Sequence, residues 1–192
     1  DELFEYIKQT KSEVSRGDVK NENVEFQGYV RNAGLILLHP FLKTFLIAAG
    51  IADHSGKIAE NNYDLAVQAL HFIATGNEAV FEPELVFEKF FCGIPMRFPI
   101  IRESLLSDEV KEEAIEMLNE VIKNWQALKN TTPAGLRETF LQRNALLQVT
   151  EKGYNLVFET RTTDILLNRI PWNYSIIKWY LIDKLIYVEW QV

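Results

Sequence analysis

The sequence predicts an α+β protein in which several short helices precede a small C-terminal antiparallel β-sheet, all within one compact domain. Up to residue 143, apolar residues recur at three- and four-residue steps between Gly and Pro stops. After residue 143, short alternating segments rich in aromatic and β-branched residues replace this pattern. The chain has 192 residues, 47% of them hydrophobic. A domain of this size buries about 70% of the surface that its unfolded chain exposes, so one substantial core is expected.

The leading segment, residues 1–31, differs from the rest of the chain. Residues 1–16 are polar with few apolar positions, which predicts either a surface helix or a lead-in from upstream sequence. Residues 17–23 break this helix, and the weak alternation of residues 24–30 predicts a short strand. We therefore expect residues 1–31 to be a leading polar helix and connector, and residues 32–192 to form the single α+β domain.

Pro40 divides the apolar run over residues 35–49 into two helical segments. Because Pro disfavours helical geometry in the residue before it, we expect His39 to end the first segment and Pro40 to be the first residue of the second. Gly50 then closes the second segment.

Two further helices have clear boundary residues. Asn62 is expected to cap a helix that runs to Thr75, and Gly76 supplies its left-handed stop. Pro83 opens the next helix, and the Gly-Ile-Pro sequence at residues 93–95 terminates it.

The clearest helix begins at Ser107 and runs to about Lys129. Ser107 is a good N-cap residue, and Asp108 and Glu109 favour the positive end of the helix dipole. Apolar residues follow at helical spacing and predict one buried face: Val110, Ala114, Met117, Leu118, Val121, Trp125 and Leu128.

Thr132 and Pro133 start another helix that reaches Leu141. A β-hairpin follows, in which residues 147–149 pair with residues 154–158 across a turn that ends at Gly153. Gly suits this turn because the position requires a positive φ.

The last quarter of the chain, residues 166–190, holds three of the four Trp residues and almost no groups suited to catalysis. Pro171 stops the helix that Asp164 starts, so the stretch predicts a short helix, a turn and two closing strands. A free tail of this composition would be sticky, and we expect the terminus to be held in a sheet.

Composition excludes several classes of protein. The net charge is −7 with no cluster of Lys and Arg, which argues against binding to nucleic acid. No apolar stretch has the roughly 20 residues that a membrane span needs, and the acidic start does not resemble a secretory signal, so synthesis in the cytoplasm is expected. The single cysteine, Cys92, cannot form an internal disulfide, and we interpret it as a small core residue.

Catalytic and cofactor motifs are missing from the sequence. There is no P-loop, no dinucleotide-binding glycine motif, no zinc-protease motif and no nucleophile elbow, so we predict no enzyme activity, no cofactor and no metal. The adjacent residues Asp53, His54 and Ser55 favour a solvated loop over a catalytic triad. His39 and His71 lie in apolar segments and are expected to be core or boundary histidines, each with a backbone hydrogen bond, rather than metal ligands.

Two groups of residues are candidates for contact with a partner. The helix after Ser107 carries five glutamates, most of them opposite its apolar stripe, a pattern typical of a solvated face, with a partner surface as the alternative: Glu109, Glu112, Glu113, Glu116 and Glu120. The C-terminal aromatic region supplies the candidate interface, although core packing is the favoured role of its Trp residues. The candidate interface residues are Trp172, Trp179, Trp190, Tyr187, Arg161 and Arg169.

Five blocks of the sequence occur in a characteristic order. The last is residues 166–190, with Ile170-Pro171-Trp172 and the ending Ile186-Tyr187-Val188-Glu189-Trp190, and the four earlier ones are residues 32–42, 70–76, 82–95, and 124–130 followed by 135–143. In these blocks the chain resembles the C-terminal region of tape measure proteins of contractile injection systems, the phage-tail-like particles of bacteria. The resemblance spans about residues 32–190. The family tends to repeat a Pro-Trp pair where this chain has Lys178-Trp179, and residues 1–31 carry no resemblance.

The resemblance implies a non-enzymatic assembly component that helps to set the length of the tail tube. Its C-terminal head would anchor the ruler at the baseplate hub and spike, with several copies around a symmetric hub, and its partners would be hub, spike and tail-tube proteins. Assembly in the cytoplasm and residence in the particle would follow. The alternatives are an assembly chaperone or adaptor that is absent from the mature particle, and a cell-wall hydrolase, which the missing catalytic motifs disfavour.

Overall fold

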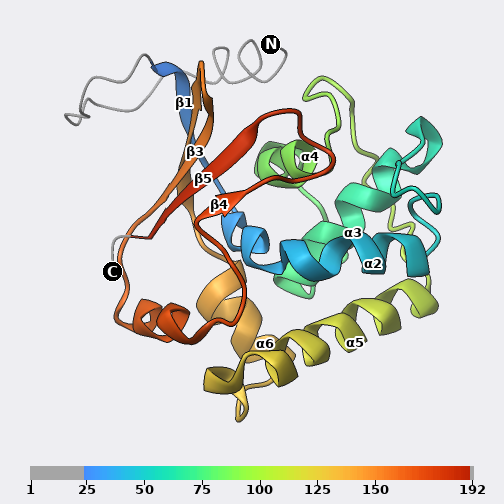
Figure 1. Cartoon of the computed structure of the whole chain (residues 1–192). Coiled ribbons are helices and arrows are strands. Elements are labelled where there is room, and N and C mark those ends of the chain that lie inside the picture. The colour runs from blue at the N-terminus through green and yellow to red at the C-terminus, as the bar shows by residue number, and fades with distance from the viewer. Residues whose placement is uncertain (1–23, 191–192) are drawn as a thin grey trace.

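The computed structural model describes residues 24–190, in which helical segments pack on one side of a five-stranded sheet (Figure 1). The helix predicted over residues 1–16 lies outside the described residues. The strand predicted over residues 24–30 is confirmed as β1 (Val24–Val30). The predicted α+β class is confirmed, and the described residues form one compact domain.

The sheet has the strand order β1-β2-β3-β5-β4. The predicted hairpin is confirmed as β2 (Ala145–Thr150) and β3 (Gly153–Phe158), and β1 pairs with β2 in the antiparallel direction. The predicted closing strands are β4 (Ile176–Ile177) and β5 (Leu185–Trp190), which also pair antiparallel. The sequence therefore predicted the strands. It did not predict that β1 joins the C-terminal strands and forms one edge of their sheet.

One pairing differs from an all-antiparallel sheet. β5 lies beside β3 in the parallel direction, with Gly153 opposite Leu185 and Phe158 opposite Trp190. Parallel neighbours need a long connection, and residues 159–184 provide it. Gly153 permits the close approach of β5, because a Cβ at this position would lie 2.4 Å from the carbonyl oxygen of Leu185.

The apolar run that contains Pro40 forms the 3-10 helix η1 (Ala33–Leu38) and the helix α2 (His39–Ala48). His39 is therefore the first residue of α2 rather than the last of the preceding segment, so the expected boundary was displaced by one residue. Pro40 still lies in the first turn, where its missing N–H has no intrahelical partner to lose.

The helix α3 (Tyr63–Thr75) follows η2 (Glu60–Asn62) and ends as predicted at Gly76, which has a φ of 77°. The predicted side-chain cap by Asn62 was wrong. The Asn62 amide instead donates to the carbonyl oxygen of Ile51, 2.9 Å away, so a tertiary contact takes the place of the cap.

The helix predicted between Pro83 and residue 93 is divided into η3 (Glu82–Glu84) and α4 (Val86–Phe91). Leu85 separates them with a φ of −90° and a ψ of 13°. The Glu82 side chain lies back against Lys89 and the backbone N–H of Ile100, which holds η3 at an angle that does not continue into α4.

The long amphipathic helix is α5 (Asp108–Asn124). Its predicted cap is confirmed, since Ser107 Oγ accepts a hydrogen bond from the Val110 N–H at 3.3 Å. It ends five residues earlier than expected, where Trp125 leaves helical geometry, and the 3-10 helix η4 (Gln126–Leu128) follows.

The last predicted helix begins as α6 (Pro133–Leu136), with Thr132 as its confirmed cap, and continues as the π-helical η5 (Arg137–Leu141). The Arg137 guanidinium donates to the carbonyl oxygens of Phe72 and Ile73 at the end of α3. This tertiary contact joins η5 to α3. Short π-helical turns of this kind occur within or beside α-helices.

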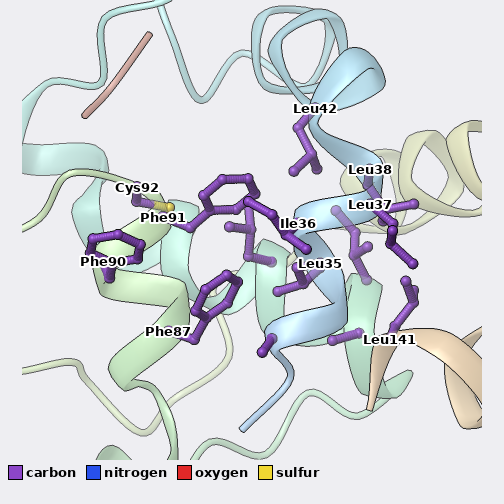
Figure 2. Packing of buried hydrophobic residues seen from close by; sticks show 14 of the residues in the cluster. Leu35, Ile36, Leu37, Leu38, Leu42, Phe87, Phe90, Phe91, Cys92 and Leu141 are labelled. Atoms are coloured by element: carbon purple, nitrogen blue, oxygen red, sulfur yellow. The ribbon is translucent and has the colours of Figure 1, made fainter. Parts of the chain in front are cut away.

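The core lies between the helices and the inner face of the sheet. Every residue of η1 is buried, and α4 directs Phe87 and Phe91 toward η1, whereas Phe90 points away from it (Figure 2). Phe90 contacts Tyr154 of β3, with ring centres 4.9 Å apart, so α4 joins the helical part of the core to the sheet. The C-terminal strands therefore share one core with the helices.

Candidate interaction surface

Two indoles of the C-terminal segment point into the core and attach this segment to distant helices. The Trp172 N–H donates to the carbonyl oxygen of Leu37 at 2.9 Å, and the Trp179 N–H donates to that of Phe91 at 2.7 Å. Trp179 also stacks on the Phe91 ring and is only 4% exposed. These contacts give both residues a structural role within the chain, whether or not they also contact a partner.

Trp190 and Tyr187 lie on opposite faces of β5. Trp190 stacks on Phe158, and the Arg143 guanidinium lies 5.1 Å from the centre of its ring. Its indole nitrogen is buried and has no hydrogen-bond partner among residues 24–190. Tyr187 pairs with Ile176 of β4 on the outer face and is half-buried.

A buried ion pair fixes the 3-10 helix η6 (Thr162–Arg169) to the sheet. The Arg143 guanidinium donates to both carboxylate oxygens of Asp164, at 2.6 and 3.1 Å, and each side chain is 1% exposed. Arg143 also donates to the carbonyl oxygen of Glu159, while Asp164 accepts the backbone N–H of Arg161. Sequence reasoning missed this pair, because neither residue belongs to a motif and the two are 21 positions apart.

The outer surface of η6 carries the other two predicted residues. Arg161 and Arg169 are exposed there, and Ile165 between them is 65% exposed. On the inner side, the carbonyl oxygen of Leu166 accepts a hydrogen bond from the buried Trp125 indole at 3.1 Å. The predicted interface residues therefore do not form one cluster, and η6 is the part of the segment that combines exposure with a rigid attachment.

A polar network that sequence reasoning did not find lies inside the helical core. Glu88 is fully buried, and one of its carboxylate oxygens accepts a hydrogen bond from the Asn32 amide at 2.7 Å. The same oxygen lies 3.4 Å from Nδ1 of His71. Asn32 has a positive φ of 53°, so Glu88 holds a strained backbone at the junction of β1 and η1.

The two histidines differ in their partners. His39 has the predicted backbone contact, with Nδ1 3.1 Å from the carbonyl oxygen of Ile36, and burial lowers its pKa. His71 instead contacts the side chain of Glu88, which the sequence did not indicate.

Neither group of potential nucleophiles forms a site. Cys92 is buried, and burial, together with the nearby Glu88 carboxylate, raises the pKa of its thiol, which keeps the thiol in its unreactive neutral form. The exposed segment at residues 53–57 forms the predicted loop. There the Asp53 carboxylate accepts hydrogen bonds from the Ser55 hydroxyl and from the backbone N–H groups of Ser55 and Lys57.

A long loop between α4 and α5, residues 93–106, is held by polar side chains of α3 and α4. Gln68 is 1% exposed, and its amide contacts the backbone of Ile101, Glu103 and Leu105. Lys89, also buried, donates to two carbonyl oxygens of the same loop. Sequence reasoning missed both residues, because a polar residue on an apolar helix face does not reveal its partner.

Two of the hollows on the surface of residues 24–190 bear on the candidate sites. One, of about 470 Å³, lies on α5 and is lined by residues that include Glu112 and Glu116, two of the glutamates predicted to form a solvated face. The other, of about 170 Å³, lies at the end of β1 beside η3 and α4. Within residues 24–190, no group of three or more His, Cys, Asp or Glu side chains is arranged to bind a metal ion, and no described helix is long and apolar enough to cross a membrane.

Comparison with protein families identifies the family of this chain. The family described as contractile injection system tape measure protein matches residues 4–190 of the chain. This match begins within the leading segment, where no resemblance was found in the sequence. No curated protein and no solved structure gives a significant match.

Proposed function

Since this chain belongs to the contractile injection system tape measure protein family, whose members have a structural role in particle assembly, we propose that it forms the head of a tail-length ruler and that η6 anchors this head at the baseplate hub or spike. In this proposal residues 32–192 form the head, and residues 1–31 connect it to upstream sequence. β1 of the connector also belongs to the sheet of the head.

The shape of the domain supports a head rather than a ruler. The longest described helix, α5, has 17 residues and spans about 26 Å at 1.5 Å per residue. A compact chain of this length has a radius of gyration of about 16 Å. Residues folded in this way dock as a preformed unit, whereas a ruler that counts residues along an extended helix needs an unbroken rod.

The surface of η6 supports the choice of anchor. One exposed arginine directly precedes η6, another ends it, and Ile165 is exposed between them in the sequence, in a chain whose net charge is −7. Arg and apolar residues are favoured at the centre of protein interfaces. The Arg143 and Asp164 pair holds η6 in place before binding, which lowers the entropic cost of association. The partner surface would be apolar with acidic groups at its rim.

Point substitutions test the anchor better than a deletion does. Deleting residues 166–190 would remove β4, β5 and Trp179, and the core would be lost together with any docking surface. We therefore suggest Ile165→Asp and Arg169→Glu in the full-length gene, with Leu105→Asp as a control. Leu105 is 46% exposed and lies on the loop between α4 and α5.

Tail lengths would be measured by electron microscopy of purified particles. We expect the two η6 variants to give tails of irregular length or few complete particles, and Leu105→Asp to give uniform tails. Uniform tails of normal length from both η6 variants would contradict the anchoring role.

The composition of the finished particle separates this function from that of an assembly chaperone or adaptor. A resident head is retained, so mass spectrometry of purified particles should detect peptides from residues 24–190. Their absence from complete particles would favour the chaperone. Release of peptidoglycan fragments by the purified protein would instead indicate a hydrolase.

A further inference from the structure

β1 forms one edge of the sheet, and among the described residues only β2 pairs with it. An antiparallel edge strand presents every second backbone N–H and C=O group away from its neighbour. The opposite edge is different, because β4 has only two residues and offers little backbone for pairing. β1 has seven residues and is therefore the edge at which a further strand could pair.

Most of this edge lacks the features that usually prevent pairing. Edge strands are commonly protected by Lys, Pro, bulges or a covering segment. Residues 26–30 of β1 contain no charged residue and no Pro, and the irregular register lies at the start of the strand, between Val24 and Phe26. Tyr29 is 62% exposed near the other end. The regular part of the edge is thus suited to accept a strand.

The smaller hollow lies at the end of this edge. It has a volume of about 170 Å³ and is lined by residues of β1, η3, α4 and the start of β2: Tyr29, Arg31, Pro83, Glu84, Val86 and Asn144. Arg31 and Glu84 form an ion pair across it, with a distance of 2.7 Å. A protein cavity of about 150 Å³ can hold a molecule of the size of benzene, so this hollow has room for one side chain.

A backbone edge that no described segment pairs with, and that has a side-chain pocket beside it, is the arrangement used in strand addition. Backbone hydrogen bonds provide affinity, and the pocket selects the side chain. Only an extended strand can satisfy the alternating N–H and C=O groups of β1. A second copy of the chain is disfavoured as the occupant, because each copy carries a net charge of −7 and the two would repel each other.

We infer that the outer edge of β1 binds an extended strand of another protein of the particle, with one side chain of that strand in the hollow beside Arg31. This surface is separate from η6 and does not require η6 to be the anchor. It would give the domain a second attachment, made through backbone hydrogen bonds.

Residue-resolved hydrogen exchange tests this inference in the natural assembly. Amide exchange along β1 would be compared between the free full-length protein and purified particles. Strand addition slows alternate amides of β1 in the particle, by up to roughly tenfold for each hydrogen bond gained. Burial under a flat surface would not produce this alternation. Unchanged exchange of β1 in the particle would overturn the inference.

Two other outcomes would also overturn it by identifying a different occupant. Protection, already in the free monomer, of the β1 amides that face away from β2 would assign the edge to the chain's own residues. Alternating protection that increases with the concentration of the free protein, together with a dimer in sedimentation, would assign it to a second copy.

A substitution at an exposed residue of β1 gives a second test that leaves the buried core unchanged. Tyr29→Lys places a charge on the exposed edge, where natural proteins use Lys to prevent pairing. We expect the particle-specific protection of β1 to be lost in this variant and retained in Leu105→Lys, a matched change at another exposed apolar residue. Retained protection in Tyr29→Lys would contradict strand addition. Because Ile165→Asp affects η6 alone, failure of one proposal can be distinguished from failure of the other.

Discussion

Arg143 and Asp164 form the buried ion pair that joins the C-terminal segment to the sheet. They connect the start of β2, the end of β3 and the first turn of η6, and both are excluded from solvent. Removing one member of a buried pair leaves an uncompensated charge, whereas exposed pairs contribute little. The pair is therefore costly to break, in addition to the contacts that Trp172 and Trp179 make for the same segment.

We predict that Arg143→Met lowers the free energy of unfolding by about 3–5 kcal/mol, because Asp164 is left buried without a counter-charge. The matched control is Lys123→Met, which removes an exposed pair with Glu120 and should cost less than about 1 kcal/mol. Urea denaturation of both variants checks this. Equal losses in the two variants would show that the buried pair has no special role.

His39 gives the protein a defined response to acid. Burial lowers its pKa in the folded state below the ordinary value of 6.5, so the unfolded chain binds a proton more readily than the folded one. Stability is therefore unaffected by His39 above about pH 6.5 and falls as the pH drops below that value. We predict a smaller loss of stability between pH 7.5 and pH 5 in His39→Gln, measured as unfolding free energy. An identical loss in both proteins would refute this assignment.

The residues that form the site illustrate what a single sequence can and cannot predict. The C-terminal Trp residues were recognisable as core or interface residues from their composition. Their partners were not, since the indoles of Trp172 and Trp179 reach carbonyl groups 135 and 88 positions away. Gln68, Glu88 and Arg143 were missed for the same reason, because the value of a buried polar side chain depends on a distant partner.

Helix boundaries were predicted best where the cap is local. Ser107, Thr132 and Gly76 act within one turn of their own helices, and each has its predicted role. Asn62 does not, because its side-chain amide donates to the carbonyl oxygen of Ile51 instead of accepting a backbone N–H of α3. The parallel position of β5 could not be predicted either, since it depends on the path of residues 159–184 rather than on the pattern within the strand.

The contact between η1 and η5 depends on Gly34. A Cβ at this position would lie 1.7 Å from the carbonyl oxygen of Phe140, so the two backbones touch directly. We predict that Gly34→Ala lowers the unfolding free energy by about 3 kcal/mol or more, because a backbone segment must move. Gly50→Ala is the control. It has open space around it and a φ of 67°, and should cost only about 1–2 kcal/mol. A mild effect of Gly34→Ala in thermal or urea unfolding would contradict this packing.

At the scale of the whole molecule, the beginning and the end of the described chain meet in one sheet and share a single core. β1 comes from the first part of the described chain and the other four strands from the last part, while the helices between them cover one face of the resulting sheet (Figure 1). Gly and Pro stops predicted this division into short segments. Such a domain cannot extend along a tube without unfolding, which is why we assign it the role of a head that docks.

The position of the domain in the assembled particle tests this role most directly. Cryo-electron microscopy of particles that carry a C-terminal label would locate residues 24–190. We predict compact density, with a radius of gyration of about 16 Å, confined to the baseplate end of the tube in contact with the hub or spike. Labelled chain extended along the tube lumen, or no label at the baseplate, would contradict the account.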